Sequence, residues 1–157
     1  MDALITRRSG SSEYNGKFDY SLYDMYGGSI LSSLTDINLK DIDTSELRSM
    51  GNMFQYCSSL QSLDLSSFNT SNVGSMEAMF QNCKSLRSLD LNNFDTSNVT
   101  SMDNMFYRCT SLRSLDLSSF NTSKVNSMED MFGGGCGLKT LYVRSEADKT
   151  KLTASDS

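Results

Sequence analysis

A 26-residue repeat constrains the fold of this chain more than any other feature. The dipeptide Met-Phe recurs at a constant step of 26 residues, at 53–54, 79–80, 105–106 and 131–132. Leucines keep the same step at 34, 60, 86, 112 and 138, without insertion or deletion, and the register extends from about residue 34 to residue 143. A unit of this length cannot bury its apolar side chains alone, so such repetition predicts units that stack on one another.

The apolar spacing changes within each unit. In LQSLDLSSF, Leu63 and Leu65 alternate with polar residues, which is the period of a strand. Further on, Val73, Met76 and Cys83 follow the intervals of three and four that are typical of a short helix or 3₁₀ segment. The pattern predicts an α/β repeat: a solenoid of about four to five coils, with short parallel strands on one face and short helical or 3₁₀ segments on the other. Five side chains are expected to be almost inaccessible, namely Leu63, Leu89, Leu115, Phe80 and Phe106.

One whole unit carries a family resemblance. The stretch SLRSLDLNNFDTSNVTSMDNMFYRC closely resembles the repeat of BspA-like bacterial surface proteins, in the 26-residue form abundant in mycoplasma surface lipoproteins. The resemblance covers roughly residues 34–143. It implies a leucine-rich-repeat solenoid that acts in adhesion or protein binding at a surface, without enzyme activity. It also implies an extracellular or surface-associated location, although the first ten residues lack the pattern of a signal peptide.

The composition excludes several function classes. A net charge of −5 argues against a nucleic-acid surface, which needs a clustered excess of Lys and Arg. No apolar run approaches the roughly 20 residues of a membrane span, so membrane insertion is not expected. His and Trp are both absent, which removes the commonest general base and the usual activator of a serine nucleophile. The sequence therefore predicts no catalytic residue, no cofactor and no metal site.

Polar side chains repeat on the predicted strand face, where the core does not require them. Asp64, Asp90 and Asp116 occupy equivalent outward positions and should form a row of carboxylates. A solvated face is the simplest interpretation and a partner-binding face the next, whereas Ca²⁺ binding or acid–base catalysis is more distant. We define the strand face as the ten residues expected to contact a partner: Ser62, Asp64, Ser66, Ser88, Asp90, Asn92, Ser114, Asp116, Ser118 and Tyr142.

Four cysteines follow the repeat. Cys57, Cys83 and Cys109 share one phase, and Cys136 lies one position late. Stacked units would bring the first three within disulfide range, but a cysteine that ends each apolar stripe behaves as a small buried hydrophobe. Buried free thiols are therefore expected, ahead of a disulfide and well ahead of a metal site.

The ends of the chain differ from its middle. Residues 1–33 predict an N-terminal cap with a hairpin around Asn15–Gly16, residues 34–143 the solenoid, and residues 144–157 a polar tail that leaves the last unit open. Together these features favour a non-catalytic module that binds a protein or a glycan through its strand face. The alternative is a structural or assembly protein of a cell-surface or virion complex, which forms homo-oligomers through the N-terminal cap or the open C-terminal end.

Overall fold

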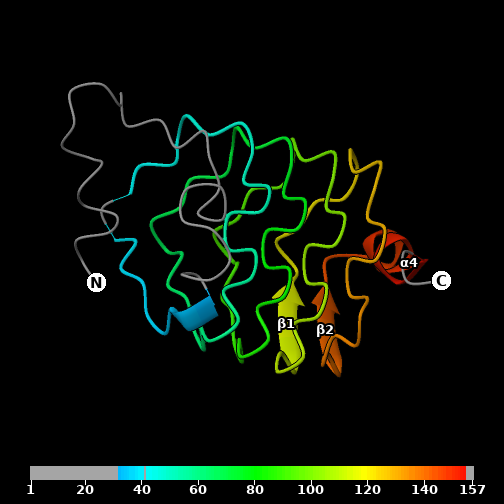
Figure 1. The fold of residues 1–157 in the computed structure, drawn as a ribbon. Helices are drawn as coiled ribbons and strands as arrows, with labels where there is room; N and C mark the ends of the chain where they lie inside the picture. The colour runs from blue at the N-terminus through cyan, green and yellow to red at the C-terminus, as the bar shows by residue number, and fades with distance from the viewer. Residues whose placement is uncertain (1–31, 41, 155–157) are drawn as a thin grey trace.

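The computed structural model describes residues 32–40 and 42–154 of the chain. The elements that lie wholly within these residues are strand β1 (Ser114–Leu117), strand β2 (Thr140–Val143) and helix α4 (Glu146–Ala154). The two strands pair in parallel, with Leu115 opposite Leu141. Figure 1 shows the preceding chain winding across the molecule toward these three elements, which gather at the C-terminal end. The hairpin predicted around Asn15–Gly16 lies outside the described residues.

The predicted fold class is wrong. A leucine-rich-repeat solenoid would carry a strand and a helical segment in each coil, whereas the described residues form one helix and two parallel strands. The Met-Phe segments are turns rather than helices. Their backbone explains the difference, because Asn52 and Tyr56 have φ angles of 59° and 65°. An L-residue in this left-handed conformation ends a right-handed helix, and the same conformation recurs at Ala78, Asn82, Asn104 and Arg108.

The left-handed residues join neighbouring units. The Asn52 N–H donates to the carbonyl of Glu77 at 2.8 Å, and the Ala78 N–H donates to that of Asp103, also at 2.8 Å. Isolated parallel bridges link one serine per unit in a continuous series, Ser49, Ser75, Ser101 and Ser127. Segments 26 residues apart therefore lie side by side, and their backbone groups bond to the next segment instead of closing a helix.

Stacked aromatic rings form the centre of the core. Phe106 is fully buried, and its ring centroid lies 5.5 Å from that of Phe80 and 5.7 Å from that of Phe132, with nearly parallel planes. Phe54 extends the same stack beyond Phe80. Of the five side chains expected to be almost inaccessible, Leu89 is the exception, because it packs against the core only partly buried. The other four are buried: Leu63, Leu115, Phe80 and Phe106.

Buried threonines connect each unit to the next. The Thr70 hydroxyl donates to the carbonyl of Asp95 at 3.0 Å and accepts from the Asp95 N–H at 2.8 Å. Thr44 and Thr96 make the same pair of bonds to the following units. Each hydroxyl thus pairs with one backbone donor and one backbone acceptor of the next unit.

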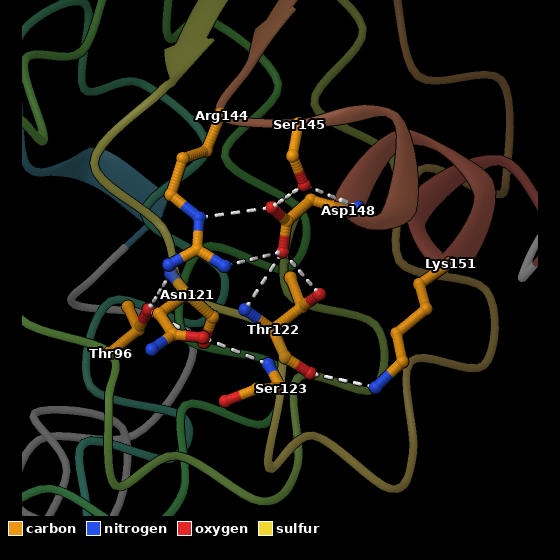
Figure 2. Close-up of polar contacts among 8 residues, drawn as sticks. All are labelled: Thr96, Asn121, Thr122, Ser123, Arg144, Ser145, Asp148 and Lys151. Atoms are coloured by element: carbon orange, nitrogen blue, oxygen red, sulfur yellow. Dashed lines mark hydrogen bonds and ion pairs between the residues drawn. The ribbon is translucent and has the colours of Figure 1, made fainter.

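Helix α4 ends this series of threonines. Within residues 42–154 no further unit lies beside Thr122, and its N–H and hydroxyl donate to Asp148 Oδ1 at 3.1 and 2.6 Å (Figure 2). Lys151 Nζ donates to the Thr122 carbonyl at 2.8 Å, and Leu152 is buried in the core. Within the segment expected to be a polar tail, Glu146–Ala154 therefore form a helix that covers part of the last unit.

The cysteines follow the expected pattern in part. Cys57, Cys83 and Cys109 are buried free thiols, which confirms their prediction, while Cys136 is half-buried. The Cys83 thiol donates to the Phe54 carbonyl at 3.2 Å. Burial raises the pKa of the Cys57 thiol to about 12, and it also raises the pKa of Cys83 and Cys109. These thiols are therefore protonated and unreactive at neutral pH.

Alkylation of the native protein should separate the four thiols by burial. We expect Cys136 to be labelled first by iodoacetamide at pH 8, and Cys83 and Cys109 to react only after unfolding, because burial both shields them and disfavours the thiolate. Peptide mass spectrometry after timed quenching measures each rate. Labelling of Cys83 at the rate of Cys136 would contradict the burial of the cysteine series.

Candidate functional site

The structure places all ten residues of the strand face at the surface. Ser114 and Asp116 point outward from β1, and Asp116 lies opposite Tyr142 of β2. Tyr142 is 56% exposed, one of two large apolar side chains described as exposed in this part of the chain. The six strand-face residues that lie within 62–66 and 88–92 are exposed as well, although these two segments are not strands. The face therefore spans the last four units and mixes carboxylates, hydroxyls, an amide and one aromatic ring.

Each aspartate of the strand face also holds a turn. Asp64 Oδ1 accepts the Ser66 N–H at 3.0 Å, and Asp116 Oδ1 accepts the Ser118 N–H at 2.8 Å. Asp90 does the same with Asn92 at 3.0 Å. An Asx turn of this kind fixes the direction of the carboxylate and explains part of the repetition without a partner. Sequence reasoning missed this role, and the recurring spacing of two residues from Asp to Ser or Asn was the signal for it.

A second row of Asx turns lies on another part of each unit. Asp43 and Asp95 accept N–H groups from Ser45 and Ser97, both at 2.9 Å. Asn69 and Asn121 take the same role in the alternate units. Asn and Asp therefore both occur as the acceptor in this turn. In the strand-face row, Asn38 of the first described unit accepts the Lys40 N–H in the same way. The charge of the strand-face aspartates is therefore not required by the turn.

Two aspartates of the strand face have a lowered pKa. Hydrogen bonds from the Ser66 side chain and backbone lower the pKa of Asp64, and those from Ser118 lower the pKa of Asp116. Both ion pairs among the described residues lie in the C-terminal segment, between Arg144 and Asp148 and between Lys149 and Glu146. Neither ion pair therefore involves a carboxylate of the strand face.

A row of basic residues runs beside the strand face. Arg87, Arg113 and Lys139 are exposed at equivalent positions of successive units. Arg113 Nη1 donates to the Gly137 carbonyl at 3.0 Å rather than to a carboxylate of the strand face. Nor does any cluster of three or more His, Cys, Asp or Glu within residues 32–40 and 42–154 have the arrangement of a metal site. The face can therefore offer separate rows of positive charge, hydroxyls and negative charge to one ligand.

Comparison with known proteins gives one match. A family model described as "Mycoplasma protein of unknown function, DUF285" matches residues 21–141. The chain belongs to this family. Searches of the curated proteins and of the solved structures found no match. The family description assigns no activity and no partner.

A membrane-spanning helix needs about 20 mostly apolar residues. None of the helices in the described part of the chain has both the length and the apolar character needed to cross a bilayer.

Proposed function

We propose that this chain is a non-catalytic binding module that recognises a protein or a glycan through its strand face. The observation that carries the proposal is the row of Asp64, Asp90 and Asp116, whose carboxylates point outward in fixed directions although Asn would hold the same turns. Carboxylates with fixed directions lose little freedom when they bind, which favours recognition. They select a partner that carries basic groups or hydroxyls.

The strand face also supplies groups that complement a chain-like ligand. Serine hydroxyls lie between the acidic and the basic rows, and Tyr142 adds an exposed ring at the C-terminal end of the face. Short polar side chains permit close approach, and a tyrosine combines apolar area with a hydrogen-bonding hydroxyl. The resemblance of the repeat to BspA-like surface proteins supports a location outside the cell, on a cell surface or a virion.

Paired charge removal tests the role of the face. We expect D64N/D116N to keep the free energy of unfolding, because Asn can accept the same turn hydrogen bond, and to weaken binding with a flatter salt dependence. Binding is first sought on arrays of glycans and of basic peptides, and the strongest ligand is then titrated by calorimetry at several salt concentrations.

The matched control is D43N/D95N, which removes two charges from the other row of Asx turns. Both double variants change the net charge equally, so a general electrostatic effect would change their affinity and salt dependence by the same amount. If D64N/D116N binds with the affinity and the salt response of D43N/D95N, the strand face is not the binding site.

A further inference from the structure

The outer edge of β2 lacks a neighbouring strand in the described part of the chain. β2 pairs with β1 on one side, and the sheet contains only these two strands. Figure 1 shows β2 as the outermost strand, with α4 beyond its carboxyl end. Backbone N–H and C=O groups along such an edge form a template for a further extended chain.

Apolar side chains beside this edge are incompletely covered. Leu138, Leu141 and Val143 are only partly buried. Their equivalents one unit earlier are between 0 and 1% exposed, namely Leu112, Leu115 and Leu117. Helix α4 lies beyond the carboxyl end of β2 (Figure 1) and bonds to the carbonyls of Thr122 and Val125 through Lys151. An added strand would therefore gain backbone hydrogen bonds and would also bury apolar surface.

Charges at the two ends of β2 decide what kind of strand fits. Lys139 precedes β2, and Arg144 follows it. A second copy paired antiparallel about the centre of β2 would place Lys139 opposite Arg144 of the other molecule, and like charges directly opposite each other are destabilising. Arg144 is partly neutralised because its Nε donates to Asp148 at 3.0 Å, so Lys139 supplies most of the attraction for an acidic partner.

We propose that the β2 edge binds an extended peptide segment of another protein, with acidic residues flanking its strand, by strand addition. The four-residue length of β2 and the adjacent lysine limit uncontrolled edge-to-edge aggregation, as is usual for natural edge strands. The proposal concerns the end of the molecule and does not depend on the strand-face carboxylates.

Designed peptides test the proposal directly. The probe is a fluorescein-labelled Glu-Thr-Val-Thr-Val-Glu peptide, compared with the same core flanked by lysines and with a version N-methylated on alternate amides. We expect the acidic peptide to bind about tenfold more tightly than the basic one, because two cross-strand charge pairs change sign. N-methylation should abolish binding, since it removes the donors along one edge of the peptide.

Variants then locate the site. Lys139→Glu should reverse the preference between the acidic and the basic peptide, whereas Lys84→Glu, an equal charge change at an exposed residue of an earlier unit, should leave it unchanged. D64N/D116N should also leave peptide binding unchanged, which separates this proposal from the function of the strand face. Three outcomes would overturn the proposal: no binding of the acidic peptide, equal binding of the N-methylated peptide, or a dimer in light scattering that the peptide dissociates.

Discussion

Replacing Phe106 with alanine is expected to lower the free energy of unfolding by about 3–5 kcal/mol, the usual cost of truncating a buried aromatic side chain. The ring is fully buried between Phe80 and Phe132, so its removal opens a cavity in the middle of the stack and breaks two stacking contacts. Urea denaturation followed by circular dichroism at pH 7 measures the loss.

Tyr142→Ala is the control for the Phe106 variant, because it removes an aromatic ring that is 56% exposed. Its free energy of unfolding should stay within about 0.5 kcal/mol of the wild type, as is usual for surface positions. Equal losses in the two variants would show that the phenylalanine stack is not the centre of the core.

Replacing Asp148 with alanine is expected to cost about 3 kcal/mol of stability, because it leaves two buried donors of Thr122 without an acceptor and a guanidinium without its partner. Asp148 also accepts a hydrogen bond from the Ser145 hydroxyl, as Figure 2 shows. Helix α4 should then detach from the last unit. Hydrogen exchange at the amides of α4 and Thr122, together with urea denaturation, measures both effects.

Acid should remove the contribution of Asp148 selectively. Burial alone would raise the pKa of this carboxyl, but hydrogen bonds from Ser145, Thr122 and Arg144 outweigh burial and hold the pKa well below its ordinary value. A carboxyl with a lowered pKa stabilises the fold above the pKa of the unfolded chain, about 3.9, and loses this effect as the pH falls toward the folded value. The stability gap between the wild type and Asp148→Ala should therefore shrink below about pH 4.

Glu146→Ala is the matched control for Asp148→Ala in the same helix. Glu146 pairs with Lys149 at 3.2 Å, but its side chain is 86% exposed, and such surface pairs contribute about 0–1 kcal/mol. Two results would refute the role of Asp148 as the acceptor for Thr122. One is a loss of unfolding free energy in Glu146→Ala as large as that in Asp148→Ala. The other is a stability difference between the wild type and Asp148→Ala that does not change with pH.

The sequence was most informative about which side chains are buried. The alternation around Leu63 and Leu65 and the repeated Met-Phe pairs predicted the inner side of each unit, and the structure differs from the five expected core residues only at Leu89. The same alternation predicted the exposure of all ten strand-face residues. Burial follows from apolar periodicity, which is a local property of the sequence.

Secondary structure was predicted less well, because the apolar spacing of a turn can imitate that of a helix. Val73, Met76 and Cys83 are buried, as the spacing predicted, yet left-handed residues such as Ala78 and Asn82 interrupt the segment. Their N–H groups bond to the next unit at 2.8 Å, which compensates for the lost helical bonds. This alternative is available only when a neighbouring unit lies alongside, so one unit read by itself could not reveal it.

The sequence by itself determined the period of 26 residues, the inward and outward side chains, and the rows of aspartates and thiols, because each depends on residue type and spacing. Only the tertiary structure decided how the last described unit is completed. Asp148 follows Thr122 by 26 residues, in the phase of the buried threonines, yet it lies on a helix. Its carboxylate accepts the hydroxyl hydrogen bond that the carbonyl of a following unit accepts from the earlier threonines. The contact between Asp148 and Thr122 depends on where the last unit ends and on which of its donors still lack an acceptor. The residue spacing within one unit gives neither.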